Sequence, residues 1–300
     1  MSRTIFQNIQ KFTHYVPTAE GSDLDALTPF VEEAEHWLKT EFIGAPLYHT
    51  IAEIAENHSG LMTFDGTFDY TFDRTIPPSN ILIAAERVIC LYAYYTAIPF
   101  VDLIQTPNGF AVVSNSNQAP ASKERVERLL EFVMVRLTSA LDFLLVFSYS
   151  YSTFRDLWKK ETEAFNRHTE IVYWTTDELQ RYANQKKLNF KDLISSHPQI
   201  LHFQSQVAEY ISMNYLKELI DKRRNAALSE EDRNVWLEVQ QIIGLKLQKL
   251  DSYLLTEQLV NYLIAHPSDF PTYFDSPEYR LKMERYYKNR KNDPTFFFNG

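Results

Sequence analysis

Apolar residues recur at helical spacing along most of the chain, which predicts amphipathic helices with one buried face. The apolar positions from Leu27 to Leu38 predict a first helix that Gly44 ends, and Pro46 begins a second. Two longer apolar patterns, at 79–98 and 120–148, predict further helices of the same bundle. The pattern therefore predicts a mainly α protein whose first domain, residues 1–150, is a helical bundle.

Two segments of this first domain depart from helical spacing. In residues 63–73 the aromatic residues occupy even positions and Thr or Asp the odd ones, a period of two that is typical of a strand. In residues 102–114 the turn sequence Pro107-Asn108-Gly109 lies between two short apolar runs. One or two short β-hairpins are therefore expected within the bundle.

The second half, residues 151–300, is expected to form a second helical domain. Ser229 is a helix cap, and apolar spacing continues from it to about Ala265, which predicts one long helix of roughly 37 residues with a bend at Gly244. The two ends of the chain differ from this pattern. The first 20 residues are expected to form a short extended arm, and the proline-rich segment after His266 is expected to form a C-terminal arm.

Charge is distributed unevenly between the two halves. The formal net charge is −9, and residues 1–150 carry all of it, with 9 Lys or Arg against 18 Asp or Glu. Phosphate contacts need Lys or Arg, so the first half is a poor candidate for binding nucleic acid. The simplest interpretation of the acidic balance is solubility.

The most apolar stretch, residues 81–101, is expected to be a buried bundle helix and not a membrane span. Glu86 and Arg87 lie inside it, and each charge near the centre of a bilayer costs about 2.5 kcal/mol or more. The first residues lack an apolar core of signal-peptide length, and Cys90 is the only cysteine. Folding in a reducing, intracellular compartment is therefore expected.

Motifs for common enzyme chemistry are missing from the sequence. Glycine is scarce, with 7 residues in 300, and neither phosphate-binding glycine loop nor the G-x-S-x-G nucleophile motif occurs. Cys90 lies between apolar neighbours, as an inert buried thiol does. The chain is therefore expected not to be an enzyme and to bind no cofactor.

Three groups of residues have the chemistry of metal ligands, but each has a simpler interpretation. Glu33-x-x-His36 is half of a di-iron helix motif, and the second half is missing. The second group lies at helical spacing and is explained by a solvated helix face. The third group lies at strand spacing, and a polar strand face explains it better than a calcium site does. No metal is expected at any of them. The second group is His49, Glu53 and Glu56, and the third is Asp65, Asp69 and Asp73.

The C-terminal segment combines a basic run with a final aromatic triplet. Interleaved acidic residues lower the net charge of the run, so a solvated helix face is its simpler interpretation. The alternative is that its cations and rings contact nucleic acid. Three adjacent rings at a free end are unfavourable in water, so Phe296, Phe297 and Phe298 are expected to pack either on this chain's own core or on a neighbouring subunit. The basic residues of the run are Arg280, Lys282, Arg285, Lys288, Arg290 and Lys291.

Residues 102–128 resemble an uncharacterised family from phages and prophages of Bacteroidales, crAss-like phages included. The resemblance lies in the turn Asn108-Gly109-Phe110, the strand Ala111–Ser114 and the helix entry Ala119–Ser122. Over about residues 20–150, the order of an arm, a helix at 25–38 and the sequence Phe42-Ile43-Gly44 before a second helix is similar to helical head–tail connector proteins of tailed phages. The second half is not part of that compact connector pattern.

The resemblance implies a virion structural protein. Head–tail connectors, or adaptor rings, form a ring, commonly twelve-fold, beneath the portal at the DNA exit. The resemblance implies that the partners are other copies of the chain and the portal and tail proteins. It also implies that DNA passes through the ring without tight binding and that no membrane is contacted. It also implies location in the virion, and in the host cytoplasm during assembly.

Candidate subunit-interface residues follow from the open hairpin edge and the aromatic tail. The alternatives are a helical binding or regulatory protein whose basic C-terminal segment contacts nucleic acid, and an enzyme with a site in the bundle core. The candidate interface residues are Pro107, Asn108, Gly109, Phe110, Phe296, Phe297 and Phe298.

Overall fold

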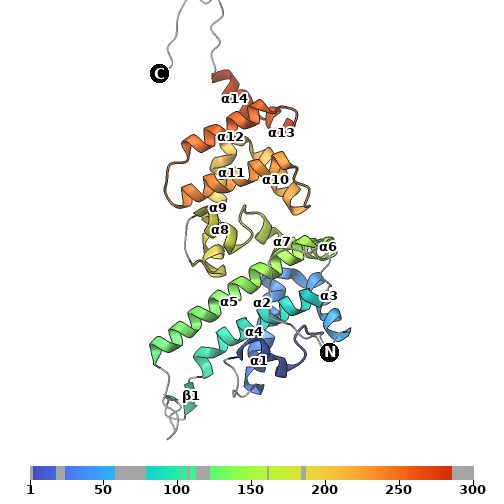
Figure 1. Ribbon diagram of the computed structural model, residues 1–300, viewed down its shortest axis with the longest axis vertical. Helices are drawn as coiled ribbons and strands as arrows, with labels where there is room; N and C mark the ends of the chain where they lie inside the picture. The colour runs from blue at the N-terminus through green and yellow to red at the C-terminus, as the bar shows by residue number, and fades with distance from the viewer. Residues whose placement is uncertain are drawn as a thin grey trace, which may run out of the picture. The chain divides into compact units, whose positions relative to one another are not determined.

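Helices make up most of the residues that the structure, a computed structural model, describes (Figure 1), so the protein is mainly α as predicted. The described residues are 3–17, 24–57, 79–101, 103–106, 109–112, 122–160, 162–183 and 187–285. Two compact units are present. The first comprises Met1–His168, Trp174–Glu178 and Lys186–Ile194, and the second comprises Thr169–Tyr173, Leu179–Gln185 and Ser195–Gly300. The first unit thus continues past residue 150, where the sequence pattern places the domain boundary.

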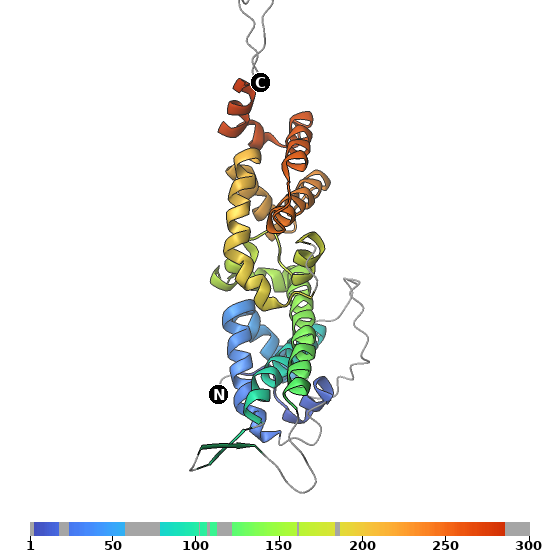
Figure 2. The same cartoon turned by 90° about the vertical axis from the view of Figure 1, so that its left-hand side faces the viewer.

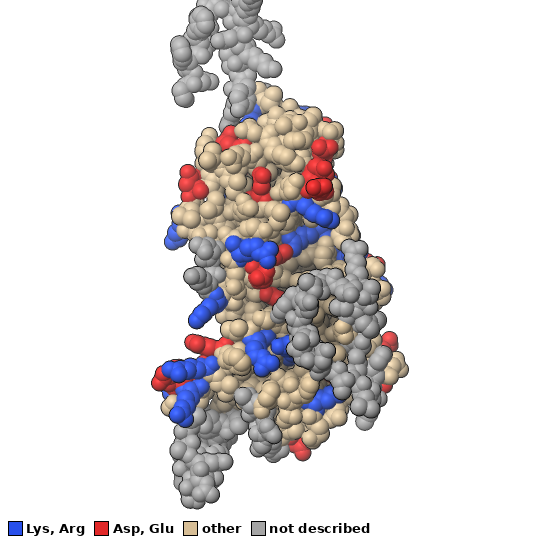
Figure 3. Space-filling model, viewed as in Figure 1, with Lys and Arg blue, Asp and Glu red and all other residues tan. Residues whose placement is uncertain are grey.

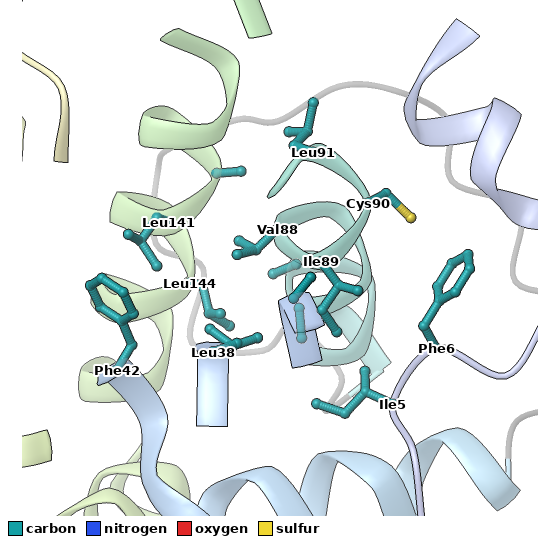
Figure 4. Close-up of a cluster of buried hydrophobic side chains, with 14 of the residues drawn as sticks. Ile5, Phe6, Leu38, Phe42, Val88, Ile89, Cys90, Leu91, Leu141 and Leu144 are labelled. Carbon is teal, nitrogen blue, oxygen red and sulfur yellow. The ribbon is translucent and has the colours of Figure 1, made fainter. Parts of the chain in front are cut away.

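The first unit is built around the apolar helix α4 (Ser79–Val101), which packs against α5 (Lys123–Ser150) and α2 (Thr28–Leu38). Figure 4 shows Val88, Ile89 and Cys90 of α4 between the N-terminal segment on one side and α5 on the other. The remaining elements of this region are η1 (Ile9–Lys11), α1 (Phe12–Tyr15), η3 (Asp25–Leu27), η4 (Lys39–Ile43), α3 (Gly44–Asn57), α6 (Ser152–Lys160), α7 (Thr162–Thr169) and α8 (Thr176–Ala183).

Helix α4 is long and apolar enough to cross a membrane, but it serves as the core of the first unit. In the most apolar 18-residue window of the stretch Asn80–Phe100, 72% of the residues are buried inside the protein. Its apolar side chains face α2 and α5, and the charged Glu86 is buried with them. The burial agrees with the interpretation of this segment as a bundle helix.

Gly44 ends the first long helix, as the sequence predicts. Helix α2 widens into the π-helical turn η4, and Gly44 follows with a φ of 71°. Glycine has no Cβ and adopts this left-handed backbone at little cost. The carbonyl oxygen of Phe42 in η4 accepts a hydrogen bond of 2.6 Å from the indole nitrogen of Trp158, which ties the turn to α6.

A two-stranded antiparallel sheet lies between α4 and α5 in the chain. Strands β1 (Leu103–Thr106) and β2 (Gly109–Val112) pair with Leu103 opposite Val112 and Thr106 opposite Gly109. Figure 2 shows the strands beyond the ends of α4 and α5. They fall within the segment 102–114, where a hairpin is expected. The other expected β element, residues 63–73, lies outside the described residues.

The N-terminal residues do not form the extended arm that the sequence pattern indicates. Residues 9–15 are helical, as η1 and α1, and the segment packs on the bundle. Ile5 and Phe12 are fully buried and Phe6 nearly so. The expectation of an extended arm was wrong because these apolar side chains fill part of the core that α2, α3 and α4 leave open.

The second unit consists of most of α9 (Phe190–Ile211) and the helices that follow it. Ser229 begins α11 with a capping box, since its hydroxyl accepts from the Asp232 amide at 3.0 Å, which confirms the predicted cap. The helices after α9 are α10 (Met213–Arg224), α11 (Glu230–Leu247), α12 (Tyr253–Ala265), α13 (Pro271–Phe274) and α14 (Pro277–Arg285).

The single long helix predicted from Ser229 to Ala265 is wrong, because the chain turns between α11 and α12. Lys249 has a φ of 58°, the Leu250 amide donates to the Leu245 carbonyl at 2.9 Å, and the Lys249 amide donates to the Lys246 carbonyl at 3.0 Å. These two bonds form the C-terminal turn that usually has glycine at the left-handed position. A lysine there gives no such signal in the sequence. Gly244, where a bend is expected, lies inside α11 and does not interrupt the helix.

Candidate assembly surfaces

Two buried carboxylates hold the N-terminal segment against the first unit. Glu35 of α2 accepts hydrogen bonds from the Phe6 amide at 2.6 Å and from the Tyr48 hydroxyl at 2.8 Å. Glu86 of α4 accepts from the Tyr15 hydroxyl at 2.6 Å and pairs with the Lys11 ammonium at 3.1 Å. A buried carboxylate is costly unless it has such partners. The segment therefore completes the fold, and it is not a free arm for docking neighbours.

Burial changes the acidity of these groups. It raises the pKa of Glu35 above its ordinary value, although the hydrogen bonds from Phe6 and Tyr48 oppose the increase. Burial and the nearby carboxylates also raise the pKa of Tyr15 and of Tyr48 well above 10. Both tyrosines thus stay protonated at neutral pH, and their hydroxyl groups donate hydrogen bonds to Glu86 and Glu35. We assign these groups to anchoring and not to proton transfer.

A third carboxylate, Asp142 of α5, caps the N-terminus of α8. It accepts a hydrogen bond from the Thr176 amide at 3.1 Å, one from the Thr176 hydroxyl, and one from the Asp177 amide at 3.3 Å. Burial nevertheless raises its pKa to about 6, with a smaller contribution from the negative charge of Glu178. Asp142 therefore joins α5 to a helix that follows 34 residues later in the chain.

We expect Asp142 to make the protein more stable as the pH falls from about 7 toward 4. Its folded pKa of about 6 lies above the ordinary 3.8, so the folded state binds this proton more tightly than the unfolded state does. The gain in the free energy of unfolding is on the order of 2–3 kcal/mol across this window. The measurement is denaturant unfolding at several pH values for the natural protein and Asp142→Asn. Identical pH dependence in the two proteins would contradict the expectation.

No sequence motif points to a site role for Glu35, Glu86 or Asp142. Each is an acidic residue inside an apolar helical stripe, where a charged residue interrupts the buried face. That interruption is the signal that could have identified them. From the sequence pattern, Glu86 speaks only against a membrane helix. The partners of these carboxylates lie 13 to 75 residues away, which the pattern of a single helix does not reveal.

The candidate metal ligands that lie within the described residues do not come together as a metal site. Glu53 and Glu56 both contact the guanidinium group of Arg3, the second at 3.1 Å. Glu33 and His36 are exposed on α2. Within the described ranges there is no group of three or more His, Cys, Asp or Glu side chains that could hold a metal ion. Asp65, Asp69 and Asp73 lie outside those ranges.

The basic C-terminal run is described only in part. Lys282 of α14 pairs with Glu257 of α12 at 3.5 Å and is mostly buried. The Lys282 ammonium group therefore forms its ion pair within the second unit. Lys288, Arg290 and Lys291 lie outside the described residues.

The candidate interface residues are also described only in part. Gly109 and Phe110 belong to β2, where they pair with Thr106 and Gln105 of β1. The remaining candidates lie outside the described residues. They are Pro107, Asn108, Phe296, Phe297 and Phe298.

Three large apolar side chains of α4 and α5 are exposed. Phe100 near the end of α4 is 67% exposed, and Phe132 and Val135 of α5 are each 56% exposed. One face of the Phe132 ring lies 5.6 Å from the guanidinium group of Arg136. We call Phe100, Phe132 and Val135 the hairpin-end surface. Phe132 and Val135 are three residues apart and share a face of α5, whereas the Phe100 ring lies 5.6 Å from the ring of Phe30 in α2. Exposed apolar side chains that share a face can mark an interaction surface.

The first turns of α5 add charged groups of both signs beside this surface. Lys123 pairs with Glu127 at 3.7 Å, and Arg128 pairs with Glu124. Figure 3 shows the charged side chains gathered at this end of α5. No residue from 122 to 132 is buried, whereas Val133 and Met134 begin the buried part of the helix. An apolar centre with a polar rim is the usual composition of a protein–protein interface.

Comparison with known proteins identifies one family and no individual relative. A family model described as a family of unknown function, DUF6712, matches residues 31–144 and 238–282, together just over half of the chain. The matched segments include the hairpin-end surface. No curated protein and no solved structure matches the chain.

Proposed function

The chain belongs to the DUF6712 family, and on this premise we propose that it is a virion structural protein, a subunit of a head–tail connector or adaptor ring beneath the portal. Its partners are then other copies of itself and the portal and tail proteins. It acts by assembly and not by catalysis. The proposed place of action is the virion, after assembly in the host cytoplasm.

The observation that carries the assembly role is the hairpin-end surface. Its three side chains are more than half exposed. Complete burial of one such side chain stabilises an interface by roughly 1.5–3 kcal/mol. Among the described residues the adjoining sheet has two strands, so each strand has one edge with which no other described strand pairs. Another chain can pair with such an edge. The exposed apolar side chains and the strand edges are each suited to contact with a neighbouring subunit.

The connector role has its support in the order of the elements and in the charge. Helix α2, η4 with Gly44 and then α3 follow one another as in the connector pattern to which the sequence is similar, although the segment before them packs on the bundle and is not an arm. The net charge of residues 1–150 is negative, which suits a conduit that DNA must pass without adhering. A ring needs two different surfaces on each subunit, because head-to-tail contacts must close a circle.

The test is whether the chain assembles and whether it is present in particles. We expect the purified protein, alone or with the portal protein from the same genome, to form rings visible by electron microscopy. We also expect it in purified particles of the encoding phage by mass spectrometry. Phe132→Ser with Val135→Ser should abolish the rings without lowering the melting temperature, because both side chains are exposed. The matched control is Glu131→Ser on the same helix.

Two results would contradict this function. One is a protein that stays monomeric with the portal protein and is missing from particles. The other is tight DNA binding that weakens steeply with salt, which would favour the alternative of a regulatory protein contacting nucleic acid through its basic C-terminal segment. A bound cofactor in the purified protein would favour an enzyme instead.

A further inference from the structure

The hairpin-end surface divides into two separate faces of the first unit. Phe132 and Val135 share one face of α5, whereas the Phe100 ring of α4 lies beside the Phe30 ring of α2. Helix α4 packs against both α2 and α5. Figure 2 shows α2 (blue) and α5 (green) set apart, with the end of α4 (teal) between them. Each copy of the chain therefore has two different apolar faces.

The face on α5 combines its apolar pair with a cation. The Arg136 guanidinium group lies 5.6 Å from the centre of the Phe132 ring and forms no ion pair with a described residue. A guanidinium group has five N–H donors, so Arg136 can contact the ring and still bind a carboxylate. We call Phe132, Val135 and Arg136 the α5 face. Glu131 borders the apolar pair on the side away from Arg136, and it is the control position in the assembly test above.

The face formed by α2 and the end of α4 is aromatic and acidic. Phe30 and Glu33 are three residues apart and share one side of α2. Glu33 is exposed and forms no ion pair with a described residue. Helix α2 has three Glu and no Lys or Arg, so no cation of its own neutralises this carboxylate. We call Phe30, Glu33 and Phe100 the α2–α4 face.

Aromatic rings continue along this face beyond Phe30. Trp37, one turn after Glu33, stacks on Tyr92 of α4 with the two ring centroids 3.8 Å apart. Burial and then the charge of Glu33 raise the pKa of Tyr92, which places the Glu33 carboxylate near this ring as well. Glu33 thus lies between the Phe30–Phe100 pair and the Trp37–Tyr92 pair.

The two faces are complementary in chemistry and in charge. Each has an exposed aromatic ring, and each has a charge without an ion-pair partner among the described residues, positive at Arg136 and negative at Glu33. Contacts between an arginine and a carboxylate are frequently bidentate, which fixes the orientation of two surfaces. A contact of the α5 face with itself brings two Arg136 side chains together, and a contact of the α2–α4 face with itself brings two Glu33 side chains together. Like charges oppose both arrangements.

We propose that the α5 face of one copy binds the α2–α4 face of a second copy, with Arg136 of the first opposite Glu33 of the second. A contact between two different faces leaves one face free at each end of a row of copies, so it continues until the row closes into a ring. This inference rests on the assembly role proposed above and names the two surfaces that such a ring requires.

Exchange of the two charges tests the pairing of Arg136 with Glu33. We expect Arg136→Glu and Glu33→Arg each to raise the protein concentration needed for assembly by about tenfold or more, because each brings like charges together. The two changes in one chain bring opposite charges together again, so they should restore a concentration within about threefold of that of the natural protein. The melting temperatures should stay unchanged, because neither side chain is buried.

Glu32 provides the matched control for this exchange. It is an exposed carboxylate on the same helix, but it lies two residues from Phe30 and therefore on another side of α2. Glu32→Arg combined with Arg136→Glu should remain as impaired as Arg136→Glu alone. Equal restoration by Glu32→Arg would show an effect of net charge only and would overturn the proposal. Failure of Glu33→Arg to restore assembly overturns it as well.

A mixing experiment shows whether the two faces bind each other. One variant, Phe132→Ser with Val135→Ser, lacks the α5 face, and the other, Phe100→Ser with Glu33→Arg, lacks the α2–α4 face. Each should stay monomeric alone in analytical ultracentrifugation, and their mixture should form one-to-one pairs and no rings. Dimers of either variant alone would show that a face binds its own copy, which overturns the proposal.

The outcomes separate this inference from the function on which it rests. If the natural protein forms rings but the mixture forms no pairs and the charge exchange restores nothing, only the pairing of these two faces fails. If the natural protein forms no rings and is missing from particles, the connector function fails together with the pairing.

Discussion

Deletion of residues 1–17 is expected to unfold the first unit and not merely to remove an arm. Ile5, Phe6 and Phe12 are buried, and burial of each is worth roughly 1.5–3 kcal/mol. Their loss alone removes about 5–9 kcal/mol, which is comparable with the whole stability of many domains. Glu35 and Glu86 would also lose their partners while still buried, and each unsatisfied group costs about 1–3 kcal/mol or more.

Single substitutions separate this effect from the consequences of a shortened chain. Phe12→Ala should lower the free energy of unfolding by about 3–5 kcal/mol. Gln7→Ala is the matched control in the same segment, because Gln7 is exposed, and should change it by less than about 0.5 kcal/mol. Denaturant unfolding of the natural protein, the truncated protein, Phe12→Ala and Gln7→Ala provides the comparison. A truncated protein that unfolds like the natural one would show that the segment is a separate arm after all.

Gly244→Ala is expected to destabilise the second unit, although alanine is the better helix former. A Cβ at this position would lie 2.3 Å from the carbonyl oxygen of Tyr182 and 2.6 Å from its carbon. Real Cβ atoms do not approach backbone so closely, so α8 and α11 must move apart. Overpacking of this kind costs about 1–3 kcal/mol, and more where the neighbour is backbone.

The sign of the change is what makes this substitution informative. At an exposed helical position, replacing glycine by alanine stabilises by about 1 kcal/mol. The Tyr182 carbonyl also accepts from the Gln248 side chain at 3.2 Å, which restricts its movement. Gln241→Ala, at an exposed position one turn earlier in α11, is the control and should be close to neutral. An increase in the unfolding free energy of Gly244→Ala would contradict the close approach.

The candidate surfaces were predictable only in part. Phe110 and the aromatic triplet are predictable from the sequence, because adjacent rings and an open strand edge need a partner. Phe132 is not predictable in this way, because an apolar residue at helical spacing is interpreted as core unless its exposure is known. Exposure depends on which neighbouring helix covers a position, and this is a property of the packed unit.

The sequence by itself determined the helices whose signals are local. The apolar stripe from Leu27 to Leu38 and the glycine at 44 define one helix and its end, because periodicity and a left-handed cap act over a few residues. Ser229 defines the start of α11 for the same reason. The charged pair Glu86-Arg87 within an apolar stretch was enough to predict a buried helix in place of a membrane span.

Only the tertiary structure decided where distant segments meet. The Phe6 amide donates a hydrogen bond to Glu35, 29 residues away in the sequence, and the Thr176 amide donates one to Asp142, 34 residues away. The turn at Lys249 replaces a longer helix, because packing of α12 against α11 outweighs the preference of a lysine for a right-handed backbone. These outcomes depend on the free energy of burying one segment against another. That energy belongs to pairs of segments and is not contained in the local pattern of either one.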